Sequence, residues 1–410
     1  MLQALNFQQP DRVPVDLGGH RAGGIMGMAY TRLREYLGLP KTLPRIYDMP
    51  QQLAIVEEDV LERFQVDVIE LGRAFCQDDS CWQPWVLPNG VECLIPRWIN
   101  PVRRNGDWVV YHQDGTPIAV QKQSMIYFDQ ACFPFRDKPE ATLNRLEEML
   151  EYEMWSALPS PPGPTIPYDP AGLRALADGA RRLRESTSRA IVGMFRCPLL
   201  EGGQHLFGMD GFFLLLAGEP DLAHRVLDGL LEIYLRRLEL FLGAVGPYID
   251  VMVCYDDYGM QTGPQISPKM YREFFKPRQK AIWQAAKKLS SAKVMLHSCG
   301  SIFDLLPDMI DAGLDVLTPV QISANGMSPE RLKAAFGDRL VFWGGGCDTQ
   351  HVLREGTPAE IRAHVYHNLD IFASGGGYVF QQVHNIEADV PPENIVAMFD
   401  AVSEWNAVHS

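Results

Sequence analysis

Two side chains that bind zinc well, His297 and Cys299, stand one residue apart directly after a short apolar run. Alternate residues that leave a β-strand point the same way, so the imidazole and the thiolate can reach one metal ion. The alternative interpretation of such a pair is a buried cysteine beside a hydrogen-bonded histidine. Cys347 follows another apolar run in a glycine-rich stretch and is our candidate for a third ligand, with a small buried hydrophobe as the alternative. Three nitrogen and sulfur ligands with an open fourth position would describe a catalytic zinc site.

An acidic pair, Asp256 and Asp257, follows a different apolar run and precedes Tyr258 and a glycine. Adjacent acids often lie on a solvated loop. Because this pair ends a run with the character of a buried strand, we expect one carboxylate to point into a cavity. There it would orient a substrate or carry a proton. His384, which follows the last apolar run, is a third candidate for a catalytic role and a competing third metal ligand.

Further polar residues follow the other apolar runs and are predicted to bind substrate. Three arginines among them would clamp an anionic group, with salt bridges between loops as the alternative. The predicted substrate-binding residues are His20, Arg21, Arg73, Arg196, Tyr258, Gln261 and Gln321.

The elements that must position these residues alternate regularly along the chain. Eight strand-length apolar runs lie at residues 13–17, 66–71, 190–195, 249–253, 293–296, 315–317, 340–343 and 378–381. Amphipathic segments typical of helices lie at 52–64, 171–185, 220–242, 268–289, 302–312, 329–336, 358–372 and 392–405. This tally predicts an α/β fold, a (β/α)8 barrel, whose active residues come from the carboxyl ends of the strands. A doubly wound sheet is the alternative, but no G-x-G-x-x-G follows the first run.

Two stretches interrupt this alternation. Residues 76–123 are a series of extended pieces separated by Pro-Asn-Gly and Gln-Asp-Gly turns, which predicts a β-rich excursion after the second strand, packed over the mouth of the barrel. Residues 156–169 are rich in proline and are predicted to be a long loop rather than a linker. We therefore expect a single barrel domain over residues 1–410.

Composition excludes several classes of function. The chain has 410 residues, 46% of them hydrophobic, with 37 Lys and Arg against 51 Asp and Glu, a net charge of −14. This charge argues against nucleic-acid binding and against a polyanionic substrate. No apolar run approaches the roughly 20 residues of a membrane helix, and no secretory signal is recognisable. Eight cysteines without paired spacing then favour a cytoplasmic protein with free thiols and no membrane contact.

Several segments together resemble the uroporphyrinogen decarboxylase superfamily. They are DRVPVDLGGHRAGG, DDYGMQTGPQISPKMYREFFKP, VMLHSCGSIFDLLPDMIDAGLDVLTPVQ, FWGGGCDTQHVLREGTPAEI and SGGGYVFQQVHNIEADVPPENIVAMFDAV. The likeness extends over residues 11–402. It implies a (β/α)8 barrel and one of two chemistries: cofactor-free decarboxylation of a tetrapyrrole, or zinc-dependent methyl transfer to or from a corrinoid protein.

Individual residues favour the methyltransferase branch, which includes the methylcobamide:coenzyme M methyltransferases and the O-demethylase systems. The decarboxylases carry an aspartate at a position that falls on Ala74 here, and of their entry arginines only Arg21 has a match. The methyltransferases carry His-x-Cys after the fifth strand, which His297 and Cys299 match. Their third ligand is a cysteine just before the last strand, at about Gly376 here, so Cys347 is our replacement for it.

The resemblance therefore implies a zinc-dependent methyltransferase. It would move a methyl group between a small molecule and a corrinoid, such as methylcobalamin, held by a partner protein. The small molecule would be a methyl ether, a thiol or a folate-like acceptor such as tetrahydrofolate, and the resemblance further implies a homodimer. Zinc would polarise the group that gains or loses the methyl. The alternatives are a cofactor-free decarboxylase, acting on a tetrapyrrole or another carboxylate, and a non-catalytic ligand-binding barrel.

Overall fold

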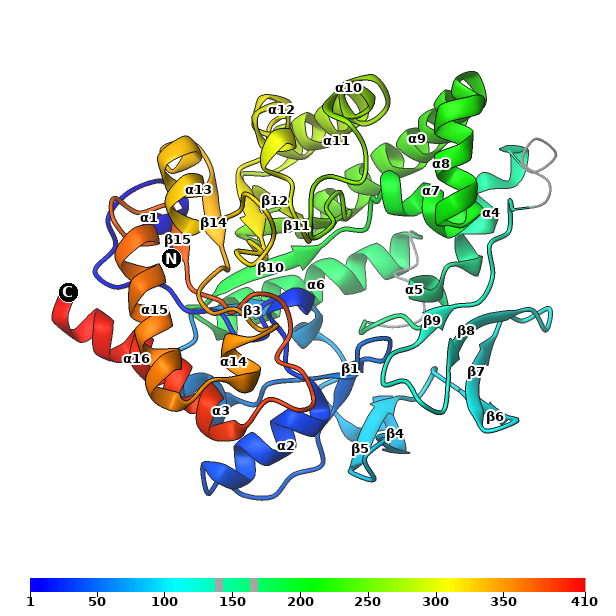
Figure 1. Cartoon of the computed structure of the whole chain (residues 1–410). Coiled ribbons are helices and arrows are strands. Elements are labelled where there is room, and N and C mark those ends of the chain that lie inside the picture. Colours follow the sequence, from blue (N-terminus) through cyan, green and yellow to red (C-terminus); the bar gives the residue numbers. More distant parts are fainter. Residues whose placement is uncertain (137–142, 163–168, 410) are drawn as a thin grey trace.

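The parallel sheet at the centre of this computed structural model curls into a barrel (Figure 1). The structure describes residues 1–136, 143–162 and 169–409. Each strand pairs with the next in chain order, in the sequence β3, β10, β11, β12, β13, β14, β15. The bounds are β3 (Val68–Glu70), β10 (Ala190–Met194), β11 (Val251–Tyr255), β12 (Lys293–His297), β13 (Val316–Thr318), β14 (Val341–Trp343) and β15 (Tyr378–Val379).

The eighth position of the barrel is filled by residues 13–17, which close the ring between β15 and β3. Val15 forms a parallel bridge with Phe380, and the carbonyl of Val15 accepts a hydrogen bond from the Asp67 amide at 2.8 Å. This segment lacks a regular strand ladder because Pro14 has no amide hydrogen to donate. The Asp67 carboxylate accepts from the amide of Val15 instead, at 2.9 Å. The predicted (β/α)8 barrel is confirmed, and an open doubly wound sheet is excluded.

Helices cover the outside of the barrel in the predicted alternation. They are α3 (Glu58–Arg63), α6 (Pro170–Ser186), α9 (Pro220–Val245), α11 (Lys276–Leu289), α12 (Leu306–Ala312), α13 (Pro329–Phe336), α15 (Pro358–Phe372) and α16 (Pro392–His409). Pro277 lies near the start of α11. In a continuous α-helix its ring would clash with the carbonyl group one turn earlier, and it has no amide hydrogen to donate to that carbonyl. The chain therefore passes from α10 (Pro268–Met270) through a π-helical turn, Tyr271–Phe275, into α11. No helix in the described ranges is long and apolar enough to span a bilayer.

One predicted helix begins too early. The segment 52–64 contains α3 only from Glu58, because Leu53–Ala54 form strand β2, which pairs with β1 (Ile46–Asp48). The amide of Ala54 donates to the carbonyl of Ile25 at 2.9 Å, so this short strand is held by tertiary hydrogen bonds that periodicity does not reveal.

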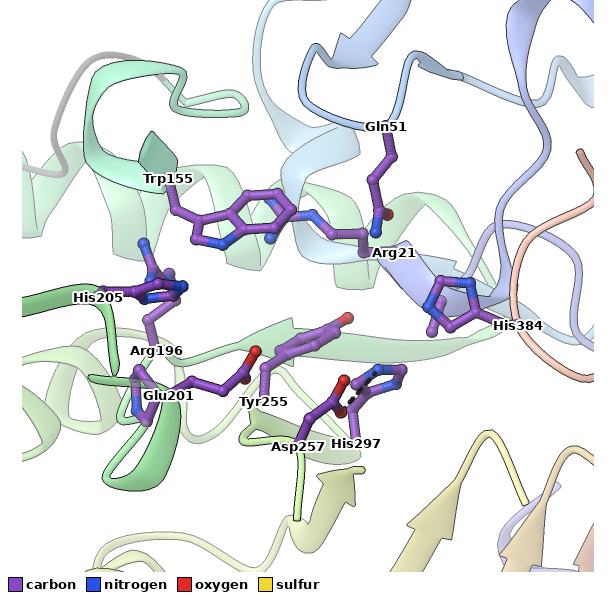
Figure 2. Close-up of a pocket in the computed structure, with 12 residues that line it drawn as sticks. Arg21, Gln51, Trp155, Arg196, Glu201, His205, Tyr255, Asp257, His297 and His384 are labelled. Carbon is purple, nitrogen blue, oxygen red and sulfur yellow. Dashed lines mark ion pairs between the residues drawn. The ribbon is translucent and has the colours of Figure 1, made fainter. Parts of the chain in front are cut away.

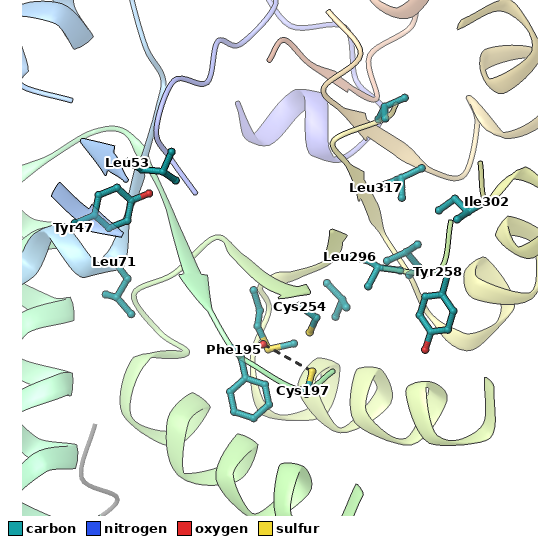
Figure 3. Close-up of a cluster of buried hydrophobic side chains, with 14 of the residues drawn as sticks. Tyr47, Leu53, Leu71, Phe195, Cys197, Cys254, Tyr258, Leu296, Ile302 and Leu317 are labelled. Atoms are coloured by element: carbon teal, nitrogen blue, oxygen red, sulfur yellow. Dashed lines mark hydrogen bonds between the residues drawn. The ribbon is translucent and has the colours of Figure 1, made fainter. Parts of the chain in front are cut away.

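Two hydrophobic layers alternate along the barrel strands. Val192, Val253, Met295 and Trp343 belong to a small inner cluster, which Leu5 of helix α1 (Leu2–Leu5) also joins. The intervening residues, such as Leu296, pack against the helices in the large outer cluster. Figure 3 shows part of that layer, with Leu296, Leu317 and Ile302 near one another. Strands buried on both faces explain the continuous apolar runs of the sequence.

The β-rich excursion forms two small antiparallel sheets beside the barrel (Figure 1). They comprise β4 (Trp82–Val86) with β5 (Glu92–Pro96), and β6 (Val102–Arg104), β7 (Asp107–Tyr111), β8 (Pro117–Gln121) and β9 (Asp129–Gln130). Both predicted turns are present, with Gly90 and Gly115 in the left-handed region that glycine adopts freely. In the predicted loop 156–169, residues 163–168 lie outside the described ranges. That the whole chain forms one domain stays a prediction.

Candidate active site

A cavity of about 540 Å³, measured with its opening, lies at the carboxyl ends of the barrel strands (Figure 2). Its described walls come from segments that are far apart in the sequence. They are Arg21, Ala22, Gln51, Trp155, Arg196, Pro198, Glu201, His205, Tyr255, Asp257, His297 and His384. None of these residues belongs to the excursion at 76–123, so the predicted cover of the mouth is supplied instead by Gln51 and by Trp155 of helix α5 (Met154–Ala157).

His297, Cys299 and His384 form a cluster with one ligand atom from each residue, all within 4.8 Å of one another. His297 is the last residue of β12, and its Nε2 lies 3.4 Å from the Cys299 Sγ. His384 follows β15 and reaches the group from across the barrel, with its ring centroid 5.3 Å from that of His297. Its φ of +63° is unusual for a residue with a side chain, so the surrounding structure holds this turn in place.

Both imidazoles are neutral in this environment. Burial lowers the pKa of His297 to about 3, and the positive charge of Arg21 adds to the effect. Burial also lowers the pKa of His384 to about 4, with a further contribution from His297 and an opposing one from Asp257. A neutral imidazole has a free lone pair, which is the form that binds a metal ion.

Cys347 does not join this cluster, contrary to our choice of third ligand. Its thiol is fully buried in the hydrophobic core and lies 3.9 Å from the carbonyl oxygen of Asp348. Gly376, which the resemblance placed at the third-ligand position, stands before β15 and packs against the backbone of Gln8. A residue that precedes a barrel strand lies at the opposite end from the cavity. His384, which follows the same strand, takes the third place.

Asp257 is the member of the acidic pair that faces the cavity. Its Oδ1 accepts the backbone N–H of Cys299 at 2.8 Å and lies 3.6 Å from the Nε2 of His297. Burial raises its pKa, while the hydrogen bond from Cys299 opposes that rise. The carboxylate therefore adjoins two of the clustered residues while it also fixes the backbone between them.

Asp256 points away from the cavity and is a correction to its predicted catalytic role. Its carboxylate accepts the backbone N–H groups of Leu199, Leu200 and Glu201 at 2.9–3.2 Å, at the start of helix α7 (Leu200–Phe207). The Tyr258 hydroxyl also donates to it at 2.7 Å. Helix N-termini have unpaired amides, and a carboxylate satisfies them. Asp256 thus positions α7, and through it Glu201.

Each of the two arginines in the cavity wall already has a carboxylate partner. Arg196 pairs with Glu153 at 2.9 Å, and Arg21 pairs with the fully buried Asp48. The Arg21 guanidinium also lies over the Trp155 ring, 4.3 Å from its centroid. The two arginines therefore form salt bridges, the alternative to a substrate clamp, and they still line the cavity, so that they bind substrate stays a prediction.

The other residues predicted to bind substrate lie outside the cavity wall. His20 is buried and bonds Gln381 at 2.8 Å, while Gln321 accepts the amide of Gly300 at 2.7 Å. Tyr258 is fully buried and packs against Tyr271 and Phe275, and the backbone carbonyl of Gln261 accepts a hydrogen bond from the amide of Asn325. Arg73 lines a separate groove on the outside of the barrel.

Sequence reasoning missed Glu201, His205, Trp155, Gln51 and Tyr255. Glu201 and His205 follow the third strand closely, where the rule for barrel active sites points. Burial and the negative charges of Asp257 and Asp256 raise the pKa of Glu201 well above its ordinary value. Gln51 lies in a turn and Trp155 in the short helix α5, and both segments reach the mouth only through tertiary packing, so no local pattern identifies them.

The clustered residues fit a zinc ion by their chemistry. Two imidazoles and one thiol are nitrogen and sulfur ligands of the kind zinc prefers, and three protein ligands leave a position for substrate. Burial, with the charges of Asp257 and Glu201, raises the pKa of the Cys299 thiol well above its ordinary value. A bound cation would reverse that shift by stabilising the thiolate.

Comparison with known proteins identifies relatives of this chain. The family model described as Uroporphyrinogen decarboxylase (URO-D) matches residues 167–405. The uroporphyrinogen decarboxylase of Methylococcus capsulatus is 25% identical over 99% of this chain and 97% of its own length. That of Psychromonas ingrahamii is 31% identical over 45% of this chain and 49% of its own length. Among solved structures, a methyltransferase from Methanosarcina mazei has the same fold, with a TM-score of 0.58 and 19% identity over 98% of this chain and 97% of its own.

Proposed function

This chain belongs to the uroporphyrinogen decarboxylase family, and from that premise we propose that it is a zinc-dependent methyltransferase. It moves a methyl group between a small molecule and a corrinoid held by a partner protein. The small molecule is a methyl ether, a thiol or a folate-like acceptor such as tetrahydrofolate. The observation that carries the proposal is the cluster of His297, Cys299 and His384, whose two histidines line the cavity.

In this proposal the residues of the site have separate roles. His297, Cys299 and His384 hold the zinc ion, which supplies Lewis acidity to the oxygen, sulfur or nitrogen that gains or loses the methyl group. Asp257 holds the backbone between His297 and Cys299 through its hydrogen bond with the Cys299 amide, and it would accept a hydrogen bond from a thiol or another substrate that carries a donor. Trp155 and Tyr255 provide aromatic walls, and Arg21 and Arg196 keep the charges of their carboxylate partners compensated.

A second candidate function is decarboxylation, which is the activity named for the similar proteins of Methylococcus and Psychromonas. Two observations weigh against it. The position of the decarboxylase aspartate corresponds to Ala74, which ends a short 3-10 helix, Leu71–Ala74, and does not line the cavity. The nitrogen and sulfur cluster has no part in a cofactor-free reaction.

Metal content tests the proposal directly. Protein purified without chelators is expected to contain about one equivalent of zinc by elemental analysis. His384→Ala and Cys299→Ala should each lose it on mild dialysis. Cys347→Ala is the matched control, because that thiol is buried outside the cluster, and it should keep the metal. Zinc retention by His384→Ala would contradict the ligand set.

Turnover separates the two candidate functions. With methylcobalamin and a panel of thiols, or with cob(I)alamin and a panel of methyl ethers, we expect a change in the corrinoid spectrum that requires Cys299. The same preparation should not convert uroporphyrinogen to coproporphyrinogen. Decarboxylation at enzyme-like rates by zinc-free protein would overturn the proposal in favour of the second candidate.

A further inference from the structure

A groove of about 870 Å³, measured with its opening, lies on the outside of the barrel, alongside β3, between the start of α3 and the end of α6. We call it the β3 groove. Ile69 of β3 lines it, together with Glu58 of α3 and Leu183 and Ser186 of α6. The β3 groove and the active-site cavity share no described lining residue, so the two sites are separate.

The groove exists because of the path of the chain after β3. In a regular barrel a helix follows each strand and covers it. Here a 3-10 helix, Leu71–Ala74, and the β-rich excursion follow β3, and α6 returns to the barrel only at Pro170. Phe75 packs near Gly179 of α6, and the space beside it remains open.

Three arginines line this groove, and two of them have carboxylate partners. Arg189 pairs with Glu58 at 2.6 Å, and Arg45 pairs with Asp79 at 2.7 Å. Arg73 differs from both. Its Nη2 donates to the backbone carbonyl of Val56 at 2.5 Å, and no carboxylate of the described residues lies within 4.0 Å of its guanidinium.

The position of Arg73 is electrostatically unfavourable without a counter-ion. Burial lowers its pKa, and the positive charge of Arg189 lowers it further, while Glu58 and Glu70 act in the opposite direction. Glu58 is paired with Arg189. Glu70 lines a small neighbouring cavity together with Tyr47 and with Arg73 itself, so its charge acts on Arg73 although the two side chains form no ion pair within 4.0 Å. A half-buried guanidinium that faces an open groove is the usual basis of an anion site.

We propose that the β3 groove binds an organic anion, a carboxylate or a phosphate ester, whose charged group pairs with Arg73. Ile55, Phe75 and Leu183 line the same groove and would contact the apolar body of that molecule. The remaining donors of the guanidinium hold the anion in the forked geometry that arginine offers. This site is independent of the methyl-transfer proposal, because it uses none of the residues of the active-site cavity.

Calorimetry with phenyl phosphate, benzoate and inorganic phosphate tests the proposal. We expect phenyl phosphate or benzoate to bind at least tenfold more tightly than inorganic phosphate, because only they carry an apolar body. The tighter of the two identifies the anionic group. Arg73→Gln should weaken binding at least tenfold. Arg63→Gln is the matched control on α3, since Arg63 pairs with Asp400 outside the groove, and it should bind normally. Equal affinity of wild-type protein and Arg73→Gln would overturn the proposal.

Hydrogen–deuterium exchange on the unaltered protein locates the anion even if Arg73→Gln fails to fold. Saturating phenyl phosphate should slow exchange in peptides that cover residues 71–77 and 186–190. Peptides that cover 197–207, which flank the active-site cavity, should be unchanged. Protection confined to 197–207 would place the anion beside Arg196 and would overturn the proposal.

Discussion

Adjacent aspartates have different tasks in this protein, although their side chains are chemically identical. Asp256 is bonded by three backbone amides and the Tyr258 hydroxyl, and it is 2% exposed. Asp257 faces the cavity beside the clustered ligands. Successive residues that leave a strand point to opposite sides, which is the physical reason for the division.

Exchange of each acid for its amide should separate the two tasks. Asp256→Asn places an N–H₂ group against backbone N–H donors, so we expect the free energy of unfolding to fall by about 1–3 kcal/mol. Asp257→Asn still accepts the amide of Cys299, so its stability should change by less than about 1 kcal/mol while turnover falls at least tenfold. Chemical denaturation and steady-state kinetics measure the two effects. Full activity of Asp257→Asn would show that its carboxylate has no chemical role.

At the scale of the element, the short helix α5 completes the cavity wall. It spans four residues, too few to be stable alone, and its first residue is held by a hydrogen bond to a distant strand. Gln130 accepts the amide of Met154 at 3.3 Å and donates to the carbonyl of His205 at 2.6 Å. Strand β9 (Asp129–Gln130) thus connects α5 to α7, and Trp155 is held over Arg21.

Removal of the Trp155 ring should affect substrate binding more than chemistry. Trp155→Ala deletes an aromatic wall and a cation–π contact, an interaction worth about 0.5–2 kcal/mol. We expect KM to rise severalfold, with kcat reduced less and the zinc content unchanged, whereas Trp155→Phe should retain most of the affinity. A fall in kcat at constant KM would assign Trp155 to the chemical step instead.

For the whole molecule, the barrel interior contains a buried acid, Asp16, whose carboxylate lies 3.5 Å from the Nε2 of His20. Burial lowers the pKa of His20 to about 3, so this neighbour is a neutral imidazole and not a cation. Asp16 is fully buried, where its carboxylate accepts from the Trp343 ring nitrogen at 2.8 Å and the Gly19 amide at 2.7 Å. Burial outweighs these hydrogen bonds and raises the pKa of Asp16 to about 7. The folded protein therefore retains this proton at pH values where the unfolded chain has released it.

This difference makes stability depend on pH in a defined direction. Between about pH 4 and pH 7 the unfolded state binds fewer protons at Asp16 than the folded state, so the free energy of unfolding contributed by this group falls as the pH rises. The loss amounts to a few kcal/mol, at about 1.4 kcal/mol per pKa unit. Asp16→Asn resembles the protonated form and should flatten the profile. Denaturant titrations across this range measure it, and parallel profiles would contradict the assignment.

The sequence by itself determined the barrel and the general location of the site. Strands buried on both faces must be continuously apolar. Polar residues are therefore found where a strand ends, at the rim of the barrel. The eight runs therefore predicted the barrel, and His297, Asp257 and His384 line the cavity at its mouth, with Cys299 clustered beside the two histidines.

Only the tertiary structure decided which of these residues meet. Cys347 and His384 both follow barrel strands, yet the side chain of one turns into the core and that of the other into the cavity. The direction depends on the curvature of each loop after its strand, as in the left-handed turn at His384. Arg73 was predicted to bind substrate together with Arg21 and Arg196. Those two line the active-site cavity, but Arg73 lies in the β3 groove, because the chain turns outward after β3. Such directions are set by packing between distant segments, which local patterns do not encode.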